Sequence, residues 1–202
     1  MTTPGTSDLK AAVAAEFTRL ADILASRSEE TWDTPSLCAG WRVREVVAHM
    51  TMAARYRPSD FLAELEACNG DFTLLSNRVA TRDSALPTPT LLGYLRDDEL
   101  HRWTPPGGGS TGALSHVVIH ALDITTPLGI SRPPDAAVLA ILDHLSNGGG
   151  HENFGVDLDG IHLQATDADW TFGSGASTTG TASDLVLWMC GRDLPVGRIT
   201  AR

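Results

Sequence analysis

The sequence predicts a mainly α-helical protein, with an antiparallel four-helix bundle followed by a small C-terminal α+β domain. Two observations lead to this fold class. Apolar residues recur every three or four positions through most of residues 8–126, which is the repeat of an amphipathic helix. After Gly129 the pattern changes, and residues 161–172 alternate apolar and polar side chains as a half-buried strand does. We therefore expect a helical domain in residues 1–130 and an α+β domain in residues 131–202.

The first predicted helix begins at Ser7 and Asp8 and ends near Ser26. Serine and aspartate side chains accept hydrogen bonds from the free N–H groups at a helix start. An apolar face follows at spacings of three and four, made of Leu9, Val13, Phe17, Leu20 and Leu24. Residues 32–41 contain a proline, a cysteine and a glycine, and we interpret them as a connector to the next helix.

The second predicted helix runs from Trp41 to Pro58, because proline stops a helix. Its apolar face consists of Val43, Val46, Val47, Met50 and Ala54. At 100° per residue, His49 falls about 120° from the centre of this face, at its edge. A histidine at such a position can reach the interior of a bundle without displacing core side chains.

Residues 59–105 predict three further helices. Two short helical patterns lie on either side of Gly70. A longer helix then begins with Thr88 as its cap and Pro89 at its first position, a combination that is typical of helix starts. Its apolar face contains four leucines, and we expect it to end before Pro105.

The next helix, from Ser110 to Thr126, carries the strongest chemical signal in the chain. His116 and His120 are four residues apart, so both imidazoles lie on one face of the helix. Asp123 lies one turn further along the same face. Most of the neighbouring residues are apolar, which predicts that this polar stripe faces protein rather than water.

A histidine pair at this spacing can bind a divalent metal, because each neutral imidazole offers one free nitrogen. On spacing alone, two hydrogen-bonded core histidines are the favoured interpretation. A metal needs a third ligand, which His49 on the second helix can supply. Two helices that direct histidines to one interior point favour a metal site made of His49, His116 and His120.

The C-terminal domain is predicted to contain two helices and two strands. Pro133, a second proline and an aspartate open a helix whose apolar face consists of Val138, Ile141, Leu142 and Leu145. Residues 161–165 and 170–172 predict two strands joined by a turn. Thr181 and Asp184 have the spacing of a capping box, which predicts a last helix up to Cys190.

Composition excludes some classes of partner and compartment. The net charge is −10, from 25 acidic and 15 basic residues, and no basic cluster occurs, so nucleic acid and anionic membranes are not expected partners. No apolar run reaches the roughly 18–20 residues of a membrane span. The first residues lack the basic and apolar regions of a signal peptide, and we expect a cytoplasmic protein.

The three cysteines are Cys38, Cys68 and Cys190. They are far apart and no Cys-x-x-Cys occurs, so neither a disulfide framework nor a thiolate zinc site is indicated. Cys38 fits either a nucleophile or a small apolar side chain beside a turn, and the second interpretation is favoured.

Two segments carry a resemblance to a known family. Residues 37–49, Leu-Cys-Ala-Gly-Trp-Arg-Val-Arg-Glu-Val-Val-Ala-His, and residues 120–129, His-Ala-Leu-Asp-Ile-Thr-Thr-Pro-Leu-Gly, resemble the mycothiol-dependent maleylpyruvate isomerase family of actinobacteria. That family belongs to the DinB-like superfamily of four-helix bundles. Residues 163–175 and 184–192 resemble its C-terminal domain, whereas residues 59–105 match least distinctly.

The resemblance implies a set of metal ligands. In the family, a divalent metal, usually zinc, is held by a histidine of the second helix and by two ligands four residues apart on the last bundle helix. By position these ligands are His49, His116 and His120, and nickel and iron are the alternative metals. The isomerases have glutamate at the position of His116. The superfamily often uses three histidines, so the departure keeps the metal but leaves the substrate open.

The resemblance also implies a reaction. The metal would activate mycothiol as a thiolate for attack on an electrophilic, anionic small molecule, which describes an isomerase or an S-transferase. In isomerisation the thiolate adds to a cis double bond, the bond rotates, and elimination gives the trans isomer. Asp123 would orient a ligating imidazole or bond nearby backbone. Arg192 would bind the anionic substrate or lie solvated at a helix end.

Two other functions stay open at this point. One is a non-catalytic, metal-stabilised DinB-like protein with a binding or stress-associated role. The other is a metal-dependent hydrolase, in which water takes the open metal position instead of a thiol. We expect a monomer or a homodimer.

Overall fold

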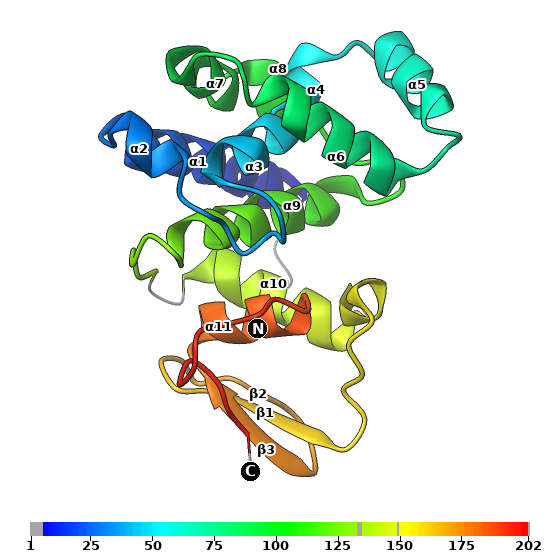
Figure 1. Cartoon of the computed structure of the whole chain (residues 1–202). Coiled ribbons are helices and arrows are strands. Elements are labelled where there is room, and N and C mark those ends of the chain that lie inside the picture. The colour runs from blue at the N-terminus through cyan, green and yellow to red at the C-terminus, as the bar shows by residue number, and fades with distance from the viewer. Residues whose placement is uncertain (1–5, 133–134, 149, 202) are drawn as a thin grey trace. The chain divides into compact units, whose positions relative to one another are not determined.

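The computed structural model describes residues 6–132, 135–148 and 150–201 (Figure 1). The chain divides into two compact units, Met1–Leu128 and Gly129–Arg202. Most of the first unit is helical, whereas the second unit combines helices with a four-stranded sheet. This confirms a mainly α protein with a small α+β part at its C-terminal end, while the antiparallel four-helix topology stays a prediction.

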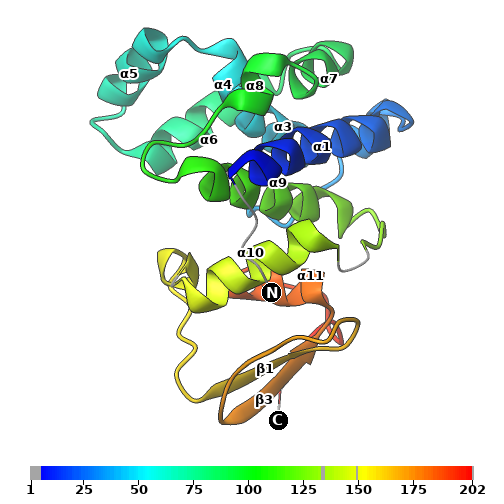
Figure 2. The same cartoon turned by 180° about the vertical axis from the view of Figure 1, so that it is seen from behind.

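Three helices form the centre of the first unit. They are α1 (Thr6–Ala25), α3 (Val43–Met50) and α9 (Gly109–Thr125). Helix α9 lies against both α1 and α3, and α6 (Phe72–Asp83) packs on α3 (Figures 1 and 2). The core comes from their apolar faces and includes Phe17, Leu20, Leu24, Val46, Val47, Leu114, Val117 and Leu122. Each such side chain stabilises the fold by about 1.5–3 kcal/mol when it is buried.

The predicted helix from Trp41 to Pro58 is broken in the structure. Helix α3 ends at Met50, and a short α4 (Met52–Arg55) follows. The buried Thr51 lies at the break, where its hydroxyl donates to the carbonyl of Val47 at 2.8 Å. A side chain that hydrogen-bonds the preceding turn in this way bends a helix. The prediction of one continuous helix was therefore wrong.

Pro58 begins a helix rather than ending one. It is in the first turn of α5 (Pro58–Ala67), where its missing N–H has no partner to lose. Helix α5 has no buried residue and contacts α6, so it projects from the rest of the unit (Figure 1). Between them, Met52, Cys68, Leu75 and Val79 form a small satellite core.

The single helix predicted from Thr88 to Pro105 is two helices in the structure. Helix α7 (Thr88–Leu95) ends with Arg96 as its C-terminal cap, and α8 (Asp98–Arg102) begins after it. The side chain of Asp97 accepts a hydrogen bond from the N–H of Glu99 at 2.7 Å, so it caps the new helix. Both helices pack on α1, and a further short helix, α2 (Glu29–Trp32), lies in the connector before α3.

The second unit places two helices on one face of its sheet (Figure 1). The helices are α10 (Ala136–Asn147) and α11 (Ala182–Met189), and a 3-10 turn, η1 (Gly150–Phe154), follows α10. Asp135 caps α10 by accepting from the N–H of Val138 at 3.0 Å. Pro133 and Pro134, which we expected to open this helix, lie outside the described residues. Thr181 caps α11 as predicted.

The sheet has the strand order β2-β1-β3-β4. Strands β1 (Ile161–Ala165) and β2 (Thr171–Gly173) are the two predicted strands, and they pair antiparallel. Strand β3 (Ala176–Gly180) pairs parallel to β1, and β4 (Thr200–Ala201) pairs antiparallel to β3. Both were missed, because β3 is rich in threonine, serine and glycine and β4 is only two residues long, so neither shows an apolar alternation.

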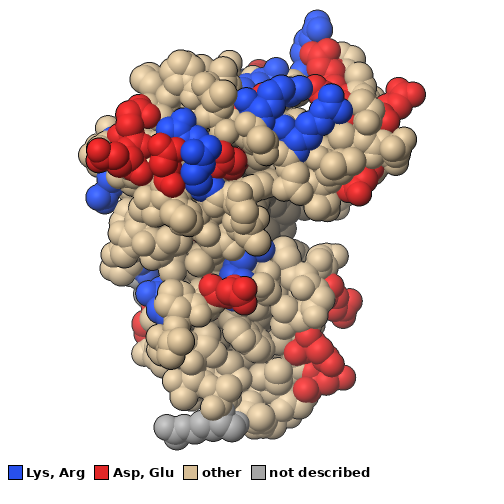
Figure 3. Space-filling view, in the orientation of Figure 1, with Lys and Arg blue, Asp and Glu red and all other residues tan. Residues whose placement is uncertain are grey.

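Charged side chains of both signs are mixed on the surface. On the face drawn in Figure 3, acidic and basic residues of the first unit lie close to one another rather than in separate patches. Ion pairs of this kind join Asp33 to Arg42 and Arg44. Among the described residues, no helix is both long and apolar enough to cross a bilayer.

Candidate metal centre

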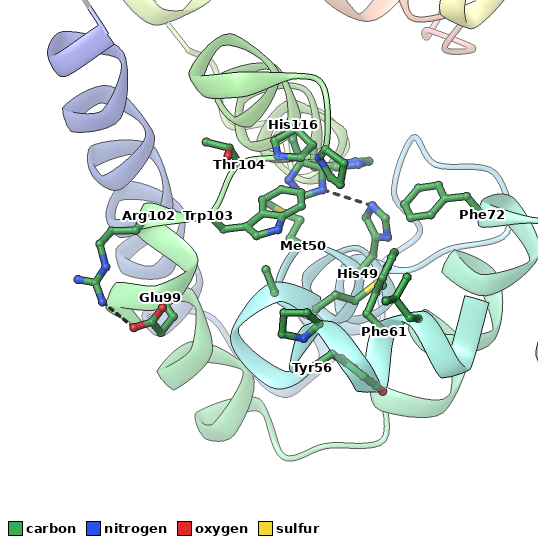
Figure 4. Close-up of a pocket in the computed structure, with 17 residues that line it drawn as sticks. His49, Met50, Tyr56, Phe61, Phe72, Glu99, Arg102, Trp103, Thr104 and His116 are labelled. Carbon is green, nitrogen blue, oxygen red and sulfur yellow. Dashed lines mark hydrogen bonds and ion pairs between the residues drawn. The ribbon is translucent and has the colours of Figure 1, made fainter. Parts of the chain in front are cut away.

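His49, His116 and His120 come together in the first unit. Each offers one ring nitrogen, and these atoms all lie within 4.8 Å of one another. Nε2 of His49 is 3.3 Å from Nε2 of His116 (Figure 4). The ring centroid of His120 is 5.0 Å from that of His49 and 4.9 Å from that of His116. The structure thus brings together the three residues that the sequence singled out.

The convergence follows from how two helices pack. His116 and His120 are one turn apart on α9, so their rings lie along one face. Helix α3 packs on α9 and presents the buried His49 from its last turn, just before the break at Thr51. The three imidazoles therefore come from two helices whose apolar faces meet.

Burial keeps at least two of these imidazoles neutral. The pKa of His49 is lowered to about 3, by desolvation first and then by the nearby His120 and Arg55, against an opposing effect of Asp123. The pKa of His116 also falls well below its usual value, because of burial first and then of His120 and His49. A neutral imidazole is the form that binds a metal, so both are ready to bind at neutral pH.

The donor set fits a divalent transition metal. Nδ1 of His49 and Nδ1 of His116 are buried and have no hydrogen-bond partner among the described residues. Their Nε2 atoms face each other, although two neutral imidazoles can form only one hydrogen bond there. A cation between the three rings would use the lone pairs that now converge. Three neutral imidazoles suit zinc, and nickel or iron to a lesser degree.

Asp123 contacts the imidazole of His120. Its side chain is fully buried, and Oδ2 lies 3.0 Å from Nδ1 of His120. A carboxylate in this position holds the proton on Nδ1 and leaves Nε2 free for a metal. The contact with an imidazole is one of the two alternatives that the sequence left open for Asp123, and its role in metal binding stays a prediction.

The sequence did not predict that Cys38 lies beside Asp123 and His120. Its Sγ donates to Oδ2 of Asp123 at 3.0 Å and lies 3.7 Å from Nδ1 of His120. The N–H of Leu37 also donates to the carbonyl of Asp123 at 3.0 Å, which ties the connector to α9. The favoured interpretation of Cys38 as an apolar side chain was therefore wrong. No local pattern could have revealed a contact between residues 85 positions apart.

Arg192 belongs to the second unit. It follows α11, and its guanidinium donates to the carbonyl of Cys190 at 3.4 Å. The three histidines, Asp123 and Cys38 all belong to the first unit. The substrate-binding role of Arg192 stays a prediction.

A pocket of about 760 Å³ opens beside the histidines, and all three of them line it (Figure 4). The rest of the wall is mostly apolar and aromatic, with Met50, Met52, Tyr56, Phe61, Phe72 and Trp103 as its larger residues. These residues belong to α3, α4 and its C-terminal cap, α5, α6 and the segment after α8. The sequence gave no signal for them, because side chains from five segments meet only in the folded unit.

Part of this chain matches a known protein family. Residues 13–96 match the family model of the mycothiol maleylpyruvate isomerase N-terminal domain, and this stretch contains α3 and His49. Residues 13–96 therefore form a domain of this family. No curated protein matches the chain.

Two crystal structures share the fold of this chain. One is of the mycothiol-dependent maleylpyruvate isomerase and the other is of a histidine-to-alanine mutant of that enzyme. Each is 15% identical in sequence, with a TM-score of 0.63, over 100% of this chain and 95% of the other. At this level of identity the likeness concerns the fold.

Asp123→Asn is expected to weaken zinc binding about 10- to 100-fold, because loss of a carboxylate behind a ligating imidazole has an effect of this size. The amide fills the same space but does not hold the proton on Nδ1 of His120 as strongly. Competition with a chromogenic chelator measures the affinity. Cys38→Ser is the control, since a hydroxyl can still donate to Asp123, and it should change the affinity less. Equal affinities of Asp123→Asn and the unsubstituted protein would contradict this role.

Proposed function

We propose that the protein is a metal-dependent enzyme that uses mycothiol as a nucleophile, either as an isomerase or as an S-transferase. The observation that carries this proposal is the convergence of three imidazoles, at least two of them held neutral, at the wall of a pocket that can admit a small molecule. The match of residues 13–96 to the mycothiol maleylpyruvate isomerase N-terminal domain supports the choice of mycothiol as the thiol.

His49, His116 and His120 would hold the metal, with zinc as the first choice. A bound divalent metal supplies the positive charge that lowers the pKa of a thiol, so that it is a thiolate at neutral pH. Asp123 orients the ring of His120, and Cys38 donates a second hydrogen bond to the same carboxylate oxygen. The apolar wall beside the histidines keeps water away from the reacting atoms.

The electrophile would enter through the same pocket. In an isomerisation the sulfur adds to one carbon of a cis double bond, the resulting single bond rotates, and departure of the thiolate restores a trans double bond. In an S-transfer the new carbon–sulfur bond is kept. Histidine at position 116, where the isomerases have glutamate, supports metal binding equally well and gives no preference between the two outcomes.

The test measures zinc binding and mycothiol binding by the same protein. We expect about one zinc per chain in protein purified without a histidine tag, and saturable binding of mycothiol by calorimetry to the zinc-loaded protein. The metal-free protein and a His116→Ala variant should bind the thiol at least about tenfold more weakly, because both lack the positive charge that holds a thiolate. Retained zinc without thiol binding would instead favour a hydrolase or a non-catalytic metal protein. Absence of zinc binding would remove the basis of the proposal.

A further inference from the structure

We propose that a short turn in the connector before α3, residues 36–41, positions the metal ligands of both α3 and α9. Cys38 acts on the imidazole of His120 through a shared carboxylate. Trp41 acts on the imidazole of His49 through ring contact. Both are positioning residues, because each acts through another side chain. The inference rests on the metal site of the proposed function and names the part of the chain that sets the geometry of that site.

The turn is closed by its own hydrogen bonds. The N–H of Ser36 donates to the carbonyl of Trp41 at 2.9 Å, and the Ser36 hydroxyl donates to the same carbonyl at 2.8 Å. That hydroxyl also accepts from the N–H of Cys38 at 3.1 Å. Gly40 has a φ of 78°, a left-handed conformation that side chains rarely adopt, and it lets the chain reverse before Trp41. The turn therefore has a defined shape, which a flexible connector would lack.

One side of the turn bonds the carboxylate behind His120. In Figure 1 the connector runs from α2 to the side of α9 and back to α3, and the N–H of Leu37 donates to the carbonyl of Asp123 at 3.0 Å. Sγ of Cys38 donates to Oδ2 of Asp123 at 3.0 Å, and the same oxygen lies 3.0 Å from Nδ1 of His120. A carboxylate oxygen that is held by a thiol has a fixed direction, so the imidazole bonded to it is also fixed.

The other side of the turn packs against His49. The ring centroids of Trp41 and His49 are 5.1 Å apart, which is closer than the 6.5 Å between His49 and Phe72. Nε1 of Trp41 donates to Oδ1 of Asn77 at 2.9 Å, so the indole is anchored to α6. Nδ1 of His49 is buried without a hydrogen-bond partner among the described residues. Its ring therefore depends on packing for its orientation, and Trp41 supplies a close part of that packing.

The turn joins ligands that come from different helices. Helices α3 and α9 meet through apolar side chains, and such packing is non-directional, so it does not fix the direction of a polar ring. A zinc ion needs its nitrogen ligands at about 2.0–2.1 Å in a tetrahedral arrangement. Cys38 and Trp41 lie in one closed turn. The turn therefore holds the rings of His120 and His49 in a fixed relation, through directional contacts that the apolar faces lack.

Ser36→Ala tests the turn as a unit. The Ser36 hydroxyl bonds the backbone of Cys38 and Trp41, and Ser36 neither belongs to the histidine set nor lines the pocket. We expect the variant to release zinc to a chelator about three- to tenfold faster, because it acts one step further away than the direct partners of ligands, whose loss costs about 10- to 100-fold. The visible absorption spectrum of the cobalt-substituted protein should also change, since it reports the geometry around the ion.

Ser36→Thr is the conservative variant for this test. It keeps the hydroxyl and should restore both the rate of zinc release and the cobalt spectrum. Unchanged zinc release and an unchanged cobalt spectrum in Ser36→Ala would overturn the proposal.

Cys38→Ala tests the contact with Asp123. Without this donor the carboxylate is less firmly oriented toward His120, so zinc should leave about three- to tenfold faster. Cys38→Ser should lie close to the unsubstituted protein, because its hydroxyl can still donate. Cys68→Ala is the matched control, since it also removes a thiol from the first unit, but from the satellite core. Equal rates in Cys38→Ala and Cys68→Ala would contradict the role of Cys38.

Trp41→Ala removes the ring beside His49. The loss should speed zinc release about tenfold, because Trp41 contacts a proposed ligand directly. Trp41→Phe keeps an aromatic ring but loses the bond to Asn77, and we expect an intermediate rate. Asn77→Ala removes the same bond and should resemble Trp41→Phe. A rate in Trp41→Ala equal to that of the unsubstituted protein would contradict the role of Trp41.

Two further measurements separate positioning from folding and from the proposed function. Urea unfolding of the metal-free variants shows whether a substitution weakens the fold. A loss of stability in Ser36→Ala with an unaltered cobalt spectrum would mean that the turn merely folds the connector, and would overturn the proposal. Faster zinc release in the turn variants of a protein whose zinc form binds no mycothiol by calorimetry would reject the proposed function and keep this inference. Mycothiol binding with unaltered zinc release in all turn variants would do the reverse.

Discussion

Replacing His49 by alanine is expected to abolish stoichiometric zinc binding while leaving the helical fold nearly unchanged. His49 is the one residue of α3 in the proposed ligand set, so its loss would leave two imidazoles on α9, and a structural or catalytic zinc needs at least three protein ligands. The affinity should fall by more than about 100-fold, since loss of a group that merely supports a ligand already costs up to about that much. Metal analysis after gel filtration and far-ultraviolet circular dichroism measure the two properties.

The fold should survive because apolar side chains hold α3 in place. Val46 and Val47 are fully buried, whereas the imidazole of His49 lies at the edge of this face. His162→Ala is a matched control, since this histidine lies on β1 in the second unit and bonds the carbonyl of Gly173. It should retain one zinc per chain. Full zinc content in His49→Ala would show that His49 is not a ligand.

Asp83→Asn is expected to destabilise the protein by about 3–5 kcal/mol, the usual effect of removing one partner of a buried ion pair. The side chains of Arg55 and Asp83 are only 7% and 11% exposed. Asp83 also accepts from Tyr56 and from Arg82, so one carboxylate joins α4 and its end to α6. The asparagine would leave the guanidinium of Arg55 buried with a neutral partner. Urea unfolding at pH 7 measures the loss.

The pH of this measurement follows from the pKa of Asp83. Burial alone would raise this pKa, but hydrogen bonds from Arg82, Tyr56 and Arg55 together hold it below its usual value. A depressed pKa contributes stability that is present above the pKa of the unfolded state and is lost as the pH falls through the folded value. At pH 7 the contribution is fully present. Asp60→Asn, which removes an exposed pair with Arg57, is the control and should cost less than about 1 kcal/mol.

Much of the first unit could be predicted from local patterns. The spacing of apolar residues located α1, α3, α6 and α9, because a helix that packs on one face must repeat every three to four residues. The same periodicity placed His116 and His120 on one face and His49 at the edge of another. The breaks at Thr51 and Arg96 were missed, since each depends on a few hydrogen bonds that leave the apolar repeat intact.

By itself, then, the sequence determined most of the helices of the first unit and the faces on which the three histidines lie. Both depend on neighbours within a few turns of chain, where side-chain direction follows from the helical repeat. Tertiary structure alone decided that Cys38 hydrogen-bonds Asp123 and that aromatic side chains from several segments enclose an apolar pocket. These contacts join residues far apart in the chain, and they form only when packing of the apolar faces brings the segments together.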